Sequence, residues 1–317
     1  MTKRSPVIDT PIAPELARYE PLRTPEQDLS AVATGPFDPG GQPHPPAGFL
    51  LGLADWNRHP WPKALHLVVE AERLGFAFAL AAQADGEDAL DAFASSYAVA
   101  AETRRIVIAP TVSLRSHLHP LHVARFVANL DHIAGGRGAL CLAAGDDAVR
   151  ARFLGLEPAS AADGEADEFV TLVKHAWTIA TPFNFAGRYF SSRRAALVGP
   201  RPLRLPRPFL ALAGGADAVE LAARSFDWLL LDAGVVVDFA SAARDRAALA
   251  YGRRLQILAT INVTDAPGPH LISELTALAG IEGVEGALIH FADGVRGLHE
   301  FGSRVLPVFR ANAMRSM

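Results

Sequence analysis

The sequence has little cysteine, no block of basic residues and no long apolar run. Cys141 is its one cysteine, which excludes a disulfide framework and a thiolate metal cluster and predicts a buried structural thiol. The 30 Lys and Arg residues are balanced by 34 Asp and Glu residues, so the charge pattern does not favour a nucleic-acid-binding protein. Apolar runs such as FAFALAA (76–82) fall far short of the roughly 20 residues that cross a membrane. The N-terminal residues lack the apolar segment of a signal peptide, so we expect a cytoplasmic protein that binds neither nucleic acid nor membrane.

Regular patterning is missing from residues 1–48, which include the stretch GPFDPGGQPHPPAG. Proline removes backbone donors and glycine raises the entropy lost on folding, so this extension is expected to be a loop or to be partly disordered. It could lie over the domain that follows or across a partner. Residues 49–317 are expected to form one domain.

Short apolar segments alternate with amphipathic ones from residue 49 onward. The expected strands are 49–54, 76–82, 105–113, 138–144, 208–214, 227–233, 255–263 and 286–292. The expected helices are 60–75, 88–103, 120–134, 165–180, 216–225, 236–252, 269–280 and 295–311. Continuously apolar strands separated by helices indicate a parallel sheet buried on both faces. Eight such units predict an α/β fold, a (β/α)₈ TIM barrel, with a doubly wound open sheet as the alternative.

Two further stretches predict local structure. FNFAGRYFSS (183–192) indicates a small hairpin that turns at 186–187. In HPLHVARFVANLDHIAGGRG (119–138), proline suits the first helical turn, the two glycines end the helix, and Arg137 is expected at the negative helix end. The expected buried stripe is Val123, Phe126, Val127, Leu130 and Ile133. The expected polar stripe, toward solvent or a dimer partner, is His122, Arg125, Asn129 and His132.

The chemistry of a (β/α)₈ barrel lies at the carboxyl ends of its strands. This rule alone gives the following candidates: Asp55, Trp56, Gln83, Ser113, Arg115, Gly145, Asp146, Asp147, Gly214, Gly215, Asp232, Thr260, Asn262 and His290.

Several motifs in one order carry a family resemblance: EAERLGFAFAL, TRRIVIAPTVS, HPLHVARFVANLDHIAGGRG, ADEFVTLVKHAW, FNFAGRYF and RPFLALAGGADAVELAARSFDWLLL. Over residues 49–311 the chain resembles the bacterial luciferase-like flavin monooxygenases, and within them the alkanesulfonate monooxygenase branch. The resemblance implies a reduced-FMN-dependent monooxygenase that acts with O₂ on a small organic, possibly sulfur-containing, substrate. It also implies a separate flavin reductase and a homodimer formed through helices 88–103 and 120–134. A deazaflavin-dependent oxidoreductase is a lesser alternative, because the family contains such members.

The resemblance and the strand-end rule together give two sets of site residues. The cofactor-binding candidates are Gly145, Gly214, Gly215, Ala216, Gln83 and Ser113. The catalytic candidates are Arg115, His119, Thr260 and His59. In LAGGADAV (212–219) two glycines between a strand and a helix suit a phosphate, although an ordinary turn is the alternative. His117 and His119 could pair on a metal, but no third ligand follows at a recognisable spacing, so no metal site is predicted.

The chain also departs from the alkanesulfonate branch. Leu258 and Thr260 stand where the branch has Arg and His, the long insert after this strand is missing, and Gly86 replaces a cysteine. Ala143 and Ala144 similarly replace polar side chains beside the flavin. Trp56, Arg58 and His59 could supply the lost lid, and Arg115 the lost cation. The alternative hypothesis is therefore a non-catalytic flavin-binding protein or a partner subunit of a catalytic homologue.

Overall fold

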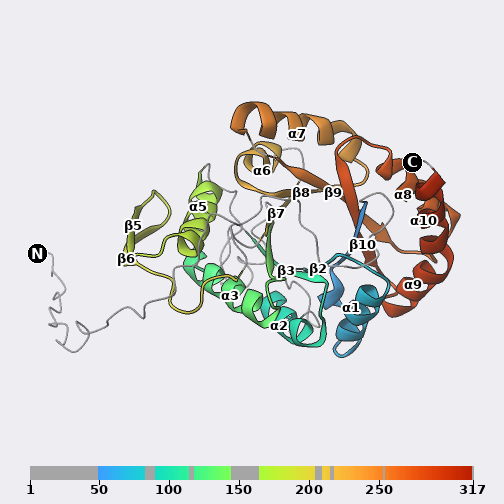
Figure 1. Ribbon diagram of the computed structural model, residues 1–317, viewed down its shortest axis with the longest axis horizontal. Coiled ribbons are helices and arrows are strands. Elements are labelled where there is room, and N and C mark those ends of the chain that lie inside the picture. The colour runs from blue at the N-terminus through green and yellow to red at the C-terminus, as the bar shows by residue number, and fades with distance from the viewer. Residues whose placement is uncertain are drawn as a thin grey trace, which may run out of the picture. The chain divides into compact units, whose positions relative to one another are not determined.

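The fold is taken from a computed structural model that describes residues 49–82, 90–113, 118–143, 164–203, 209–214, 218–252 and 254–315. Within them, parallel strands form a closed barrel in the order β1-β10-β9-β8-β7-β4-β3-β2, and helices surround it (Figure 1). The barrel strands are β1 (Leu50–Ala54), β2 (Phe78–Ala81), β3 (Val107–Ser113), β4 (Ala139–Ala143), β7 (Phe209–Ala213), β8 (Trp228–Asp232), β9 (Gln256–Val263) and β10 (Val284–Phe291). The prediction of a (β/α)₈ barrel is confirmed.

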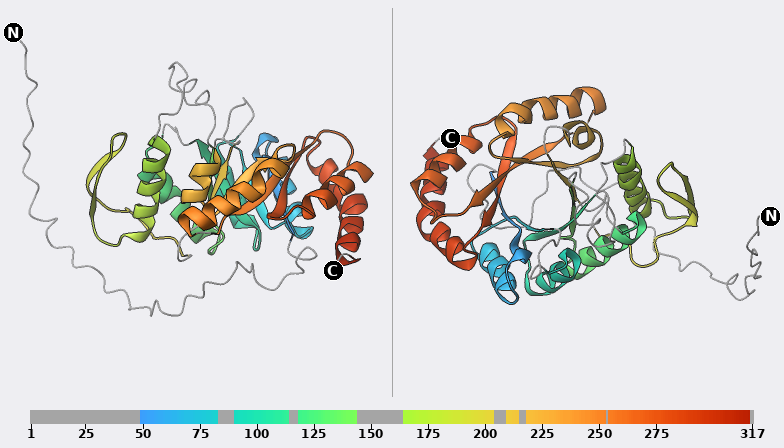
Figure 2. Two further views of the ribbon diagram at one scale, coloured as in Figure 1. Left: turned by 90° about the horizontal axis from the view of Figure 1, so that it is seen from above. Right: turned by 180° about the vertical axis from the view of Figure 1, so that it is seen from behind.

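The helices around the barrel follow the strands in chain order (Figure 2). They are η4 (Trp56–Arg58), α1 (Lys63–Arg73), α2 (Ala92–Glu102), α3 (Pro120–Ile133), α5 (Glu165–Thr178), α6 (Val219–Ser225), α7 (Val236–Tyr251), α8 (Pro269–Ala279), α9 (Val295–Glu300), η6 (Phe301–Val305) and α10 (Leu306–Arg315). None of the helices in the described ranges combines the length and apolarity that a membrane crossing requires.

Pairing between the first and last strands closes the barrel. β1 and β10 run in parallel from the pair Leu50 and Gly286 to the pair Leu53 and Ile289. Leu51 and Leu53 are almost completely buried in the core cluster that also contains side chains of the surrounding helices. The intervening residues of β1 face the barrel interior, since alternate residues of a strand point to opposite faces. β1 is therefore apolar on both sides, as the sequence predicts for a strand of a parallel sheet.

The predicted hairpin is β5 (Phe183–Ala186) with β6 (Ser191–Ala195), and it lies beside α5, outside the barrel (Figures 1 and 2). The Gly187 N–H donates to the carbonyl of Phe190 at 2.9 Å and closes the turn. The Glu168 carboxylate on α5 accepts the N–H groups of Arg188, Tyr189 and Phe190 at 2.7, 2.8 and 3.0 Å. The motifs DEF (167–169) and GRYF (187–190) therefore contact each other, and this contact joins the hairpin to the helix.

Other predictions need correction. The expected helix 88–103 begins at Ala92, because the Asp91 side chain accepts the N–H groups of Phe93 and Ala94 as an N-cap. The expected last helix is interrupted by the π-helical turn η6. Ile133 is 51% exposed, so it does not belong to the buried stripe of α3, because the helix ends there and turns its last residue outward.

Arg137 was expected at the C-terminal end of its own helix, and this was wrong. Its guanidinium instead donates to the carbonyls of Ala100, Thr103 and Ile106, at 3.3, 3.0 and 2.6 Å. These carbonyls lie at and beyond the C-terminal end of α2, where they have no partners within the helix. Arg137 therefore joins α2 to the start of the neighbouring strand β3.

The polar stripe of α3 contacts residues 199–201 of the same chain. His132 Nε2 lies 2.6 Å from the carbonyl of Arg201, and Gly199 lies next to Arg125 and Asn129. The segment that follows the hairpin thus runs along this face of α3, a third possibility beside solvent and a dimer partner.

Candidate functional site

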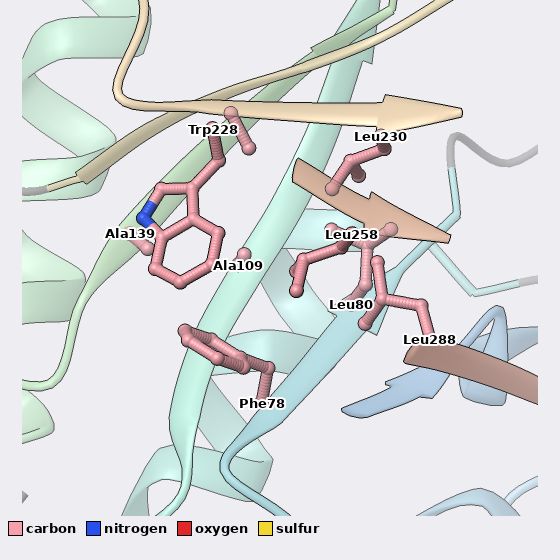
Figure 3. A pocket seen from close by; sticks show the side chains of 9 residues that line it. Phe78, Leu80, Ala109, Ala139, Trp228, Leu230, Leu258 and Leu288 are labelled. Atoms are coloured by element: carbon pink, nitrogen blue, oxygen red, sulfur yellow. The ribbon is translucent and has the colours of Figure 1, made fainter. Parts of the chain in front are cut away.

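The lower barrel interior is filled by apolar side chains (Figure 3). They enclose a cavity of about 30 Å³, which has room for one or two water molecules but no polar lining to hold them. The lining residues are Phe78, Leu80, Ala109, Ala139, Ala211, Trp228, Leu230, Leu258 and Leu288. The rings of Phe78 and Trp228 meet edge to face at 5.2 Å. These side chains form an apolar floor across the barrel.

Polar residues gather on the same inward faces toward the carboxyl ends of the strands. Counting in steps of two from the residues that line the cavity places a set of polar side chains at the barrel mouth. These are Thr111 and Ser113 on β3, Asp232 on β8, Thr260 and Asn262 on β9, and His290 on β10. Such a boundary between a dry floor and a polar rim is where a (β/α)₈ barrel binds its ligands.

On one side of the mouth, the strand ends that the structure describes carry small side chains. Ala143 on β4 and Ala213 on β7 are register partners, and both continue the inward rows of the cavity wall. Cys141, one step below, is fully buried, and burial raises the pKa of its thiol to about 12. The thiol therefore stays protonated, and the prediction that it is buried is confirmed. This part of the wall is therefore formed by small side chains, and Ser113 lies beside it on β3.

A pair of histidines lies on the opposite side of the mouth. The rings of His59 and His290 are nearly parallel, with centroids 6.1 Å apart and an interplanar angle of 12°. His59 Nε2 lies 3.1 Å from the carbonyl of Phe291, which can only accept, so Nε2 carries the proton. Burial lowers the pKa of His59, and the positive charges of Lys63 and protonated His290 lower it further, although the hydrogen bond to Phe291 acts against both. His59 is therefore neutral at pH 7, and His290 lies beside it on an inward position.

The segment that follows β1 holds the rim in place. Asp55 has a left-handed backbone (φ 53°), donates its N–H to the carbonyl of Leu80 at 2.9 Å, and pairs with Arg58 at 3.3 Å. The side chain of Asn57 is fully buried and donates to the carbonyls of Ala82 and Leu90 at 2.9 and 2.8 Å, while its Oδ1 accepts the N–H of Ala82. Asn57 thus fixes both ends of the connection after β2. Sequence reasoning missed this residue, because an asparagine between Trp and Arg has no distinctive pattern.

The predicted site residues fall into three groups. Ser113, Thr260 and His59 lie at the mouth, and Gly214 directly follows β7. Thr260 Oγ1 donates to the carbonyl of Leu231 at 3.3 Å, so its hydroxyl is partly used within the sheet. His119 is the N-cap of α3, because its Nδ1 accepts the N–H of Leu121 at 3.2 Å. The candidates that lie outside the described residues are Arg115, Gln83, Gly145, Gly215 and Ala216, together with Gly86, His117, Ala144, Asp146 and Asp147.

The suggestion that Trp56 forms part of a lid is wrong. Its indole is completely buried in the core cluster, so only Arg58 and His59 of that segment reach the surface.

The connection after β9 is short, because α8 begins at Pro269 only six residues after Val263. Within the described residues no group of three or more His, Cys, Asp or Glu side chains is placed to hold a metal ion.

A barrel with this mouth and this order of motifs is matched by the family model of luciferase-like monooxygenases over residues 35–269. The chain belongs to the luciferase-like monooxygenase family. A Mycobacterium tuberculosis protein named as a coenzyme F420-dependent oxidoreductase is 30% identical over 200 residues, which are 58% of this chain and 55% of that protein. The chain thus spans about half the length of this curated relative.

Solved structures with the same fold include enzymes with two different cofactors. An F420-dependent secondary alcohol dehydrogenase, in complex with an F420–acetone adduct, superposes with a TM-score of 0.71 at 16% identity, over 82% of this chain and 99% of that chain. A riboflavin lyase with modified FMN and riboflavin superposes with a TM-score of 0.66 at 16% identity, over 83% of this chain and 92% of that chain. At these identities the likeness shows the fold alone.

Proposed function

We propose that the chain is an oxidoreductase that binds a reduced flavin-type cofactor at the barrel mouth and acts on a small organic molecule. The observation that carries this proposal is the boundary inside the barrel, where a dry apolar floor meets a rim with Ser113, Thr260 and His290. A cofactor of this type supplies a hydride, or electrons for O₂ activation, and depends on the protein for orientation and exclusion of water.

The residues of the mouth have distinct roles in this proposal. Leu258 and Leu288 would exclude water from below, and Ala143 and Ala213 would leave room for the cofactor ring over the ends of β4 and β7. The imidazole of His290, on an inward position at this rim, can form a hydrogen bond with the substrate. These residues fit a flat, partly apolar cofactor with a polar edge.

We propose F420 as the cofactor, with reduced FMN and O₂ as the second candidate. The name of the Mycobacterium tuberculosis relative supports a deazaflavin, and the short connection after β9 adds no segment that could close over the mouth. Direct hydride transfer is less sensitive to water than O₂ chemistry is. The family name supports the monooxygenase, which would need a separate flavin reductase. No named relative points to a sulfonate, so the substrate class is left at a small organic molecule.

Anaerobic fluorescence titration with F420, FMN and reduced FMN tests the proposal. We expect saturable binding of one cofactor, and its loss when Ala213→Phe fills the small-residue wall. Ala101→Phe, on the exposed face of α2, is the matched control and should bind normally. If none of the three cofactors binds, the proposal fails. Binding without oxidation or reduction of the cofactor in the presence of any organic substrate would instead support the non-catalytic alternative.

We also propose the homodimer through α2 and α3. Its support is the exposed apolar side chain of Ile133 (51%) at the end of α3. Phe93 on α2 would be a poor position at which to test this interface. It is buried against Phe126, with ring centroids 5.2 Å apart, so a charged residue there would destabilise the fold itself. Ile133→Glu should shift the protein from dimer to monomer in sedimentation, whereas Leu249→Glu, on the exposed face of α7, should not.

A further inference from the structure

A groove beside the mouth lies between the start of α1 and the start of α9. Its volume is about 520 Å³, roughly the size of a small-molecule site. It is lined by His59, Pro60, Lys63, His66, Leu67, Ala292, Asp293, Gly294, Val295 and Arg296. Both edges of the groove follow the carboxyl ends of barrel strands, β1 on one side and β10 on the other. The groove therefore opens on the same end of the barrel as the mouth.

The lining of this groove is predominantly basic. Lys63, Arg296, His59 and His66 contribute basic groups, whereas Asp293 contributes the one carboxylate of the lining. Arg296 pairs with Glu300 at 3.3 Å and His66 with Glu70 at 3.5 Å, both one helical turn further on. The Arg296 and His66 side chains of these pairs are 77% and 60% exposed, so both can turn toward a ligand at low cost.

His59 connects the groove to the mouth. One face of its ring lies against His290, which points into the barrel, and its edge lies against Gly294, at the opposite side of the groove. A Cβ on Gly294 would come within 3.1 Å of His59 Cε1, so glycine permits this close packing. A molecule held at the mouth beside His290 can therefore extend past His59 into the groove and stay in contact with the protein along its length.

We propose that this groove binds an oxyanion, a carboxylate or a phosphate, of the molecule whose reacting end lies at the mouth. The inference rests on the proposed function for the position of the reacting end. The source of the oxyanion is either the substrate or the tail of the cofactor, and the chemistry that recognises it is the same in both. The basic side chains outnumber the one carboxylate of the lining, Asp293, while Glu300 and Glu70, the partners of Arg296 and His66, lie outside the lining.

Binding of an oxyanion should strengthen as the pH falls. His59 is faced by Lys63 and His66 on α1, His290 on β10, Asp293, and Arg296 on α9, and of these groups Lys63 and His290 act against its protonated form. A bound anion offsets this repulsion and raises the pKa of His59 toward its ordinary value. The ring resonances of His59 report this change directly.

Titration of the full chain with inorganic phosphate at constant ionic strength, followed by histidine ring NMR, tests the proposal without any cofactor. We expect saturable shifts of His59 and His66, and affinity reduced by roughly ten- to a hundredfold in the double variant Lys63→Gln, Arg296→Gln. Arg193→Gln, on the β6 strand across the barrel from α1 (Figure 1), is the control and should bind as the wild type does.

The competition arm distinguishes the two sources. Phosphate that stays bound when the mouth is saturated with F420 or FMN assigns the groove to the substrate, whereas displacement assigns it to the cofactor tail. Either result upholds an oxyanion site. Shifts that do not saturate, or that are equally weakened by Arg193→Gln, overturn it. Because phosphate is measured in the protein without cofactor, failure of cofactor binding would contradict only the proposed function.

Discussion

At the scale of single residues, buried and half-buried carboxylates hold the connections between elements. Asp131 in α3 is completely buried, and its two oxygens accept the N–H groups of Gly138 and Leu203 at 3.0 and 2.7 Å. It thereby fixes the start of β4 and the segment that runs along α3. Asp131, within the stretch HPLHVARFVANLDHIAGGRG, is therefore a structural residue, and so is Arg137 of the same stretch.

Asp131→Asn should destabilise the protein by about 2–3 kcal/mol, because the amide NH₂ would replace one acceptor and face a buried N–H group. Urea unfolding measures this difference. Asp265→Asn, an exposed carboxylate between β9 and α8, is the control and should change stability by less than about 0.5 kcal/mol. Equal stability of the two variants would contradict the role assigned to Asp131.

A second carboxylate makes stability depend on pH. Burial acts to raise the pKa of Glu72, but the N–H groups of Ile106, Arg105 and Arg104 and the charge of Arg105 outweigh it and hold the pKa below the ordinary 4.5. A lowered folded-state pKa stabilises the protein above the unfolded value, and this stabilisation is lost as the pH falls through the folded value.

Glu72→Gln should therefore be less stable than the wild type at pH 7, and the gap should close below pH 4.5. Chemical unfolding of both proteins across this range checks the expectation. Glu102→Gln, an exposed residue at the end of α2, should show no comparable convergence. A gap that stays constant down to the lowest pH would show that the charge of Glu72 is not what stabilises the connection.

At the scale of elements, the hairpin β5–β6 depends on its contact with α5. A Cβ on Gly187 would lie 2.1 Å from Oε2 of Glu168, so a side chain there cannot coexist with the three hydrogen bonds that the carboxylate accepts. Gly187→Ala should release the hairpin from the helix while the barrel stays folded. Hydrogen exchange of residues 188–195 should then increase, whereas the barrel strands should keep their protection.

Gly268→Ala is the matched control for this experiment, because a Cβ there meets no atom closer than 3.9 Å and the backbone is extended. If Gly187→Ala leaves exchange in the hairpin unchanged, the contact with Glu168 does not hold it.

The elements were predictable from sequence because each barrel strand is apolar on both faces and each helix has an apolar stripe. The π-helical turn η6 could not be predicted from sequence, since FGSRV has no pattern that distinguishes a π-turn from an α-helix. The mouth was predictable only as a list of strand ends. His59 and His290 are far apart in sequence, and their stacked rings follow from the β1–β10 pairing that no local pattern encodes. Asn57 was missed for the same reason, because its partners lie in a different connection.

At the scale of the whole molecule, the closure between β1 and β10 decides whether the mouth and the groove exist, since both take residues from each of these strands or from the segments that follow them. Two glycines lie at this closure, and the space around them differs. A Cβ on Gly286 would come within 2.3 Å of the backbone oxygen of Leu50, whereas a Cβ on Gly52 would meet the side-chain end of Leu288 at the same distance.

The two substitutions should therefore have graded effects. Leu288 lines the cavity of about 30 Å³ and can turn into it, so Gly52→Ala should cost about 1–2 kcal/mol. The backbone next to Gly286 cannot move without separating the strands, so Gly286→Ala should cost more than about 4 kcal/mol and lower cofactor and phosphate binding together. Thermal unfolding and both titrations measure the comparison. If Gly286→Ala were no more harmful than Gly52→Ala, the barrel would tolerate an open seam, and the mouth and groove would not depend on its closure.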